Sequence, residues 1–156
     1  MNSCCTPAPW RPVAVWIMCG LLAAVFALAA VPKIADPAAF AEAVYRYHLL
    51  PDALVNIAAV YLPWFEAVCA LALVAGTRFR RGALLAVAAM LLLFIGAMGI
   101  NLHRGVDIAC GCFSVASGGD AMSWLNIARN LGLLAITVLA WRWTPPPAAP
   151  ENLQRL

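Results

Sequence analysis

The sequence predicts an all-α, polytopic membrane protein, a bundle of four transmembrane helices with a short interfacial helix on its outer side. Two observations support this fold class. Hydrophobic residues make up 65% of the 156 residues and charged residues only 11%, which is far more apolar than a soluble domain. The apolar residues also form four blocks, each close to the roughly 20 residues that a helix needs to cross a bilayer. Because lipid offers no hydrogen-bond partners, such blocks are expected to be helices rather than strands.

These blocks define the domain organisation. The predicted spans are residues 13–31, 53–76, 82–102 and 124–143. They form one membrane domain over 13–143, with an N-terminal tail at 1–12 and a Pro-rich C-terminal tail at 144–156. A cleaved signal peptide is the alternative for the first block, since a basic residue precedes it and ALAA near its end resembles a cleavage site. The length of this block and the three spans that follow it favour a retained helix.

Basic and aromatic residues predict how the spans are oriented. On one side the flanking basic residues are Arg11, Arg78, Arg80, Arg81, Arg142 and Arg155, with the tryptophans Trp10, Trp16, Trp141 and Trp143 nearby. On the other side they are only Lys33, Arg46 and Arg104. The positive-inside rule therefore places both termini in the cytoplasm of a bacterial inner membrane, and the loop 103–123 in the periplasm, where disulfides persist. The net charge of +3 is small and dispersed, so it gives no support to a nucleic-acid partner.

A short helix is predicted between the first two spans, over about 37–49. Asp36 is a candidate N-cap and Pro37 suits the first helical position. Apolar residues then recur at i, i+4 and i+7, as in an amphipathic helix that lies flat in the membrane interface: Phe40, Val44 and Tyr47. This helix is expected to cover the outer end of the bundle.

The loop 103–123 contains two cysteines, Cys110 and Cys112, separated by one glycine. Residues two apart bring their Cα atoms near the separation that a disulfide requires, and glycine eases the closure of so small a ring. Closure is expected to strain the ring, and a strained, exposed disulfide exchanges readily. This pattern favours a redox-active pair. Two free thiols, a one-sided metal site and separate disulfides to other cysteines remain open alternatives.

A second group of polar residues lies within the spans. Glu66 and Arg129 are each inside an apolar block, where an uncompensated charge is costly, and their backbones differ in depth by roughly 10 Å. One interpretation is a buried Glu–Arg pair that only fixes helix packing. The other is a polar inlet beneath the CGC loop, where a quinone head group or a proton is handled. His103 is either a base that stabilises a Cys110 thiolate or a boundary residue that reaches into the interface.

Four consecutive stretches of the chain carry a resemblance to a known family: KIADPAAFAEAVYRYHLLP, LPWFEAVCALALVAG, NLHRGVDIACGCF and ARNLGLL. They resemble the methylamine utilisation protein MauE family, within the wider DoxX-like four-helix membrane proteins. The resemblance covers nearly all of residues 13–143. It implies a four-helix bundle that forms or maintains disulfides in exported proteins, often alongside thioredoxin-like partners. It also implies Cys110 and Cys112 as the redox pair, with associated polar positions at Glu66, Arg104, Arg129 and Asn130.

The function predicted from these features is that of a membrane thiol–disulfide oxidoreductase. The Cys110–Cys112 disulfide is expected to accept electrons from a periplasmic thioredoxin-like or thiol-containing protein through a mixed disulfide. By analogy with vitamin K epoxide reductase-like proteins, a membrane quinone is the expected cofactor and electron acceptor, and no metal is expected. The candidate quinone contacts are Glu66, Trp64 and Arg129.

Two alternatives belong to other functional classes. A soft-metal carrier for mercury or copper would use all six cysteines, with Cys19 and Cys69 along the path and Cys4 and Cys5 at its inner end. Against it, Cys19 and Cys69 occur singly within apolar spans, where a buried cysteine is usually an inert small hydrophobe. The third hypothesis is a non-catalytic membrane anchor that holds a thioredoxin-like partner.

Overall fold

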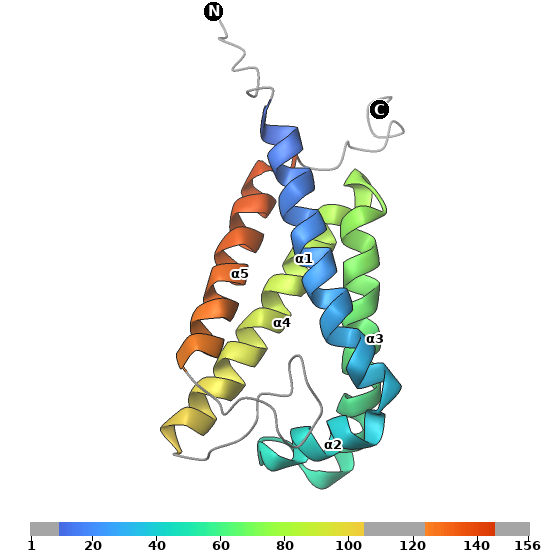
Figure 1. Cartoon of the computed structure of the whole chain (residues 1–156), viewed down its shortest axis with the longest axis vertical. Helices are drawn as coiled ribbons and strands as arrows, with labels where there is room; N and C mark the ends of the chain where they lie inside the picture. Colours follow the sequence, from blue (N-terminus) through green and yellow to red (C-terminus); the bar gives the residue numbers. More distant parts are fainter. Residues whose placement is uncertain (1–9, 105–123, 146–156) are drawn as a thin grey trace, which may run out of the picture.

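The structure, a computed structural model, describes residues 10–104 and 124–145. All regular structure in these residues is helical (Figure 1). The helices are α1 (Trp10–Ala35), α2 (Pro37–Arg46), α3 (Asp52–Val74), α4 (Thr77–His103) and α5 (Trp124–Trp143). The all-α prediction is therefore confirmed for this part of the chain, whereas Cys110, Cys112 and most of the CGC loop lie outside it.

Three of the helices are long and apolar enough to cross a membrane. They are α1, α3 and α4, with mean hydropathies of 2.5, 2.0 and 2.6 over their most apolar stretches. These three fit a multi-pass membrane protein. The fourth predicted span, α5, is not among these three, so the prediction of four transmembrane helices is confirmed only in part.

The four long helices contact one another in a closed order. α1 packs along α3 and also touches α5, while α4 touches both α3 and α5. The diagonal pairs α1 with α4 and α3 with α5 make no substantial contact. In Figure 1, α4 begins beside the end of α3 and runs away from it, so the two helices are far apart where α2 packs against the start of α3.

At one end of the molecule α1 begins, α5 ends and α3 leads into α4 (Figure 1). Arginine and tryptophan side chains from these helices contact one another there. Three guanidinium groups lie over indole rings, at 4.1 Å for Arg80 over Trp16, 4.7 Å for Arg81 over Trp141 and 5.7 Å for Arg11 over Trp143. Such cation–π contacts each contribute about 0.5–1 kcal/mol at exposed sites and more when desolvated. These three arginines and three tryptophans therefore lie at one end of the molecule, as predicted, while Arg155 is outside the described residues.

Next to this end lies the apolar core, formed chiefly by α1, α3 and α4. Leu22, Leu73 and Leu84 are completely buried in it. Cys19 and Cys69 are free thiols packed in the same core, with exposures of 0% and 4%. Both therefore occupy the apolar surroundings expected of inert cysteines.

The short helix predicted between the first two spans is present as α2. Asp36 Oδ1 accepts a hydrogen bond from the backbone N–H of Ala39 at 2.9 Å, and Pro37 is the first helical residue, as predicted. Phe40 is the buried residue of this helix. The helix ends at Arg46 rather than near residue 49, because the His48 N–H bonds back to the Tyr45 carbonyl and His48 adopts φ 47°. This left-handed residue stops the helix before Pro51.

One boundary differs from the prediction in a way that matters for function. The first span was expected to end at residue 31, with Lys33 in the outer flank. Instead α1 continues through Pro32 to Ala35, and Lys33 lies in its last turn with only 2% exposure. The prediction of Lys33 as a flanking charge is therefore wrong. A lysine near a helix C-terminus is favoured by the helix dipole, but burying it requires a partner.

Candidate functional site: a buried Lys33–Glu66 pair between two cavities

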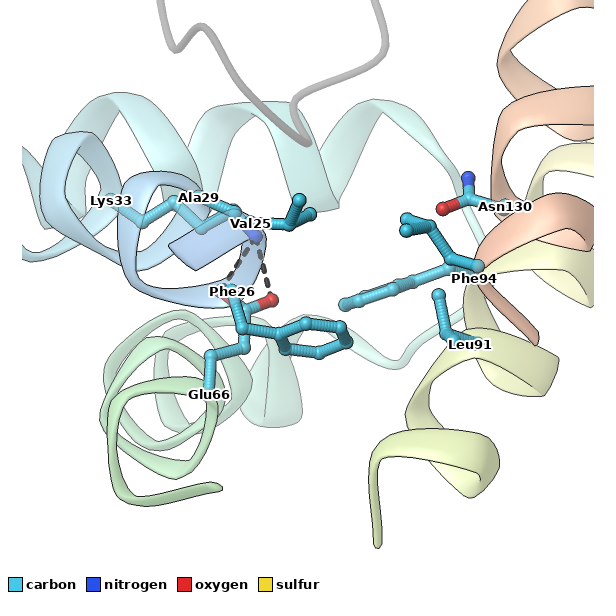
Figure 2. A pocket seen from close by; sticks show the side chains of 9 residues that line it. Val25, Phe26, Ala29, Lys33, Glu66, Leu91, Phe94 and Asn130 are labelled. Carbon is cyan, nitrogen blue, oxygen red and sulfur yellow. Dashed lines mark hydrogen bonds and ion pairs between the residues drawn. The ribbon is translucent and has the colours of Figure 1, made fainter. Parts of the chain in front are cut away.

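The partner of Lys33 is Glu66. Lys33 Nζ lies 2.7 Å from one carboxylate oxygen of Glu66 and 2.9 Å from the other, and the two side chains are 2% and 1% exposed. Helix α1 supplies the lysine and the adjacent helix α3 the glutamate (Figure 2). Each charge compensates the other, which is the condition under which ionisable groups are tolerated in a membrane interior.

This pairing corrects the interpretation that joined Glu66 to Arg129. Both carboxylate oxygens of Glu66 are occupied by Lys33, and Arg129 is an exposed residue of α5. Helices α3 and α5 lie diagonally across the molecule and do not pack together. The predicted depth difference of roughly 10 Å between the two backbones allowed the side chains of Glu66 and Arg129 to meet. The order of the helices, however, puts α1 and not α5 next to Glu66.

A small cavity of about 20 Å³ adjoins the ion pair, which is room for one water molecule. Figure 2 shows that the rings of Phe26 and Phe94 point into the space between the pair and Asn130, which lies on the far side. All four long helices contribute to its lining. The cavity therefore links two of the predicted polar positions, Glu66 and Asn130, across a mainly apolar gap.

Asn130 is 4% exposed and is held by its own helix. Its Nδ2 donates to the Asn126 carbonyl at 3.1 Å and also faces Met98 Sδ at 3.9 Å. On α4, Asn101 is likewise buried and donates to the Ala97 carbonyl at 3.1 Å. These amides add polarity to the interior beyond the ion pair.

A much larger cavity, of about 600 Å³, lies on the other side of Lys33, between α2, α3 and α4. The described residues that line it are almost all apolar, and Lys33 is the one charged residue among them. Lys33 and Phe94 line both cavities. The Lys33 ammonium lies 5.1 Å from the centre of the Phe40 ring and 5.4 Å from that of Phe94, so two aromatic faces contribute to holding it.

Other predicted site residues lie apart from these cavities. Trp64 is 59% exposed on α3 and lines neither one. His103 and Arg104 are exposed at the end of α4, the position expected of boundary residues. Cys110 and Cys112 are outside the described residues.

Lys33 is the residue that sequence reasoning missed. The available signal was a basic residue immediately after an apolar block, in a chain with a glutamate deep in the next block. Opposite charges in neighbouring spans are candidates for pairing, since each is costly alone. The preceding Pro32 concealed this signal, because proline is usually taken as a helix end.

Fold and site together define an α-helical, multi-pass membrane protein whose interior holds a buried ion pair beside an apolar cavity. Residues 11–143 match the profile of the family described as "Methylamine utilisation protein MauE", and the chain belongs to this family. No solved structure was found to match.

Curated relatives support this assignment. The methylamine utilization protein MauE of Paracoccus denitrificans is 37% identical over 144 residues, which is 92% of this chain and 76% of the relative. That of Methylorubrum extorquens is 37% identical over 141 residues, covering 89% and 75%. That of Methylophilus methylotrophus is 35% identical over 118 residues, covering 75% and 62%. The relatives are thus longer than the part that this chain matches.

Proposed function

We propose that this protein is a thiol–disulfide oxidoreductase of the bacterial inner membrane that serves methylamine utilisation. It passes electrons from thiols of a periplasmic protein to a membrane quinone, and so supports disulfide formation in exported proteins. The observation that carries the proposal is the combination of the closely spaced Cys110 and Cys112 with a membrane interior that holds a compensated ion pair next to a ligand-sized cavity. Membership of the MauE family supports the link to methylamine utilisation.

The proposed topology has four crossings, with α5 as the fourth. Both termini are cytoplasmic and the CGC loop is periplasmic. Two features support it: the arginines cluster at the end where α1 begins and α5 ends, and the opposite end is where α4 stops and α5 starts. The positive-inside rule then assigns the arginine end to the cytoplasm.

The proposed reaction has two steps. In the first, a thiolate of the partner attacks the Cys110–Cys112 disulfide, and resolution of the mixed disulfide leaves the partner oxidised and the cysteine pair reduced. In the second, the reduced pair gives two electrons and two protons to a quinone, which becomes a hydroquinone while the Cys110–Cys112 bond forms again. In this scheme the buried Glu66–Lys33 pair provides the polar route that these protons need within the membrane.

Among the alternatives, a soft-metal carrier has less support. Cys19 and Cys69 would have to line the ion path, but each is packed in the apolar core. A membrane anchor without redox chemistry agrees with the fold equally well. The test below separates the anchor from an enzyme because an anchor needs no reactive cysteine pair.

The test is quinone reduction by purified protein in lipid nanodiscs, with reduced thioredoxin as a model dithiol and a ubiquinone analogue with a decyl tail as acceptor. We expect catalysed reduction that is lost in Cys110→Ser and in Cys112→Ser. The double variant Cys4→Ser/Cys5→Ser is the matched control and is expected to keep the wild-type rate. Equal rates in all variants would contradict the redox function and favour the anchor.

A further inference from the structure

The apolar cavity of about 600 Å³ between α2, α3 and α4 has the size of a small-molecule site. Leu92 and Leu93 line it and are nevertheless 57% and 67% exposed on the outside of α4. The cavity is therefore open to the molecular surface at α4, where α3 and α4 diverge in Figure 1. If α3 and α4 cross the bilayer as proposed, an opening between them gives a ligand access from the lipid.

Lys33 is the charged residue among the described residues that line this cavity, whose other polar side chain there is Tyr47. An ammonium group has three N–H donors, and Glu66 accepts from two of them. Lys33 is only 2% exposed, so water does not surround its ammonium group. Within residues 10–104 and 124–145, its ammonium group has no third hydrogen-bond acceptor. The remaining donor is thus available beside the rings of Phe40 and Phe94, which line the same cavity.

These features select the chemistry of the ligand. An anionic head group is disfavoured because the positive charge of Lys33 is already balanced by Glu66. A neutral carbonyl oxygen can accept the remaining hydrogen bond without adding charge. The flanking aromatic rings favour a flat, polarisable head group, and the apolar walls favour a hydrocarbon tail.

We infer that this cavity binds the ring of a membrane quinone, with one carbonyl oxygen accepting a hydrogen bond from Lys33 and the isoprenoid tail leaving towards lipid between α3 and α4. This inference deepens the proposed function and rests on it for the identity of the acceptor. It assigns the quinone contacts to Lys33, Phe40 and Phe94, in place of Trp64 and Arg129.

Gly96 offers a sharp test because it lines the cavity and has no atom within 4 Å of where a Cβ would lie. Gly96→Leu therefore adds a bulky side chain at the cavity wall with open space for its Cβ, and replacing glycine within a helix does not weaken the helix. Gly82→Leu is the matched control: it makes the same change near the other end of α4, also with no atom within 4 Å of a Cβ.

The experiment is photolabelling in nanodiscs with an azido-quinone, followed by mass mapping of the labelled peptides. Wild type and Gly82→Leu are expected to be labelled on α2 or α4, with competition by a decyl quinone. Gly96→Leu is expected to lower the labelling by at least about tenfold, or 1.4 kcal/mol in binding. Equal labelling of Gly96→Leu and Gly82→Leu would overturn the inference. The inference would also be overturned if a photoreactive phospholipid labelled the cavity and the azido-quinone did not.

The double variant Cys110→Ser/Cys112→Ser separates this inference from the proposed function. It cannot oxidise thiols by the proposed route, yet it is expected to bind the azido-quinone as the wild type does. Quinone binding without any thiol oxidation in the wild type would retain the site and refute the function. Thiol oxidation with labelling outside α2, α3 and α4 would retain the function and refute the site.

Discussion

Lys33 and Glu66 form a bidentate ion pair in the interior of this protein, with Nζ 2.7 and 2.9 Å from the two carboxylate oxygens. The pair ties the last turn of α1 to the middle of α3 and separates a water-sized cavity from a ligand-sized one. The pair links two candidate spans, and its Lys33 is the one charged residue among the described residues that line the large cavity.

Breaking this pair is expected to destabilise the protein strongly. Lys33→Met or Glu66→Gln leaves a buried partner without its counter-charge, which costs about 3–5 kcal/mol in comparable buried pairs. The double variant Lys33→Met/Glu66→Leu removes both charges and is expected to recover most of this loss. Thermal unfolding in detergent measures the three variants. A double variant less stable than either single variant would contradict the account.

Arg129 provides the comparison for that experiment. Because Glu66 pairs with Lys33 of α1, and α3 and α5 do not pack together, a double-mutant cycle of Glu66→Gln with Arg129→Gln is expected to show a coupling energy below about 0.5 kcal/mol. The Lys33–Glu66 cycle is expected to exceed it several-fold. A larger coupling for Arg129 would restore the Glu–Arg pairing that the helix order argues against.

Cys19 and Cys69 are expected to be dispensable for redox function. Cys19→Ala and Cys69→Ala each remove one sulfur from the apolar core, a change of about 1 kcal/mol in stability. The rate of quinone reduction in nanodiscs is expected to stay within about twofold of the wild-type rate, which is under 0.5 kcal/mol in activation free energy. Loss of activity in either variant would instead favour a path that uses the buried thiols.

The orientation can be tested with two exposed positions at opposite ends. In the Cys110→Ser/Cys112→Ser background, Glu42→Cys on α2 is expected to react with a membrane-impermeant maleimide in intact spheroplasts. Arg78→Cys on α4 is expected to react only after permeabilisation. Reaction of Arg78→Cys in intact spheroplasts would place the arginine end outside and contradict the proposed topology.

Sequence patterns were sufficient for the helices and insufficient for their partners. Apolar length and the Asp36–Pro37 signal predicted where the long helices and α2 lie, because these features are local. The partner of Glu66 depends on which helix lies beside α3, which no local pattern encodes. Pro32 hid the continuation of α1, so Lys33 was assigned to a loop. The large cavity arises from the divergence of α3 and α4, a tertiary property with no sequence signal.

The most direct test of the central claim is the redox state of Cys110 and Cys112 in intact cells. Thiols are trapped with a membrane-impermeant alkylating reagent, and the peptide that carries both cysteines is mapped by mass spectrometry, with and without quinone depletion. The account predicts an oxidised pair in normal cells that becomes reduced when quinone is removed. A pair that stays reduced and accessible in both conditions would contradict quinone-linked thiol oxidation and return the metal-carrier alternative to consideration.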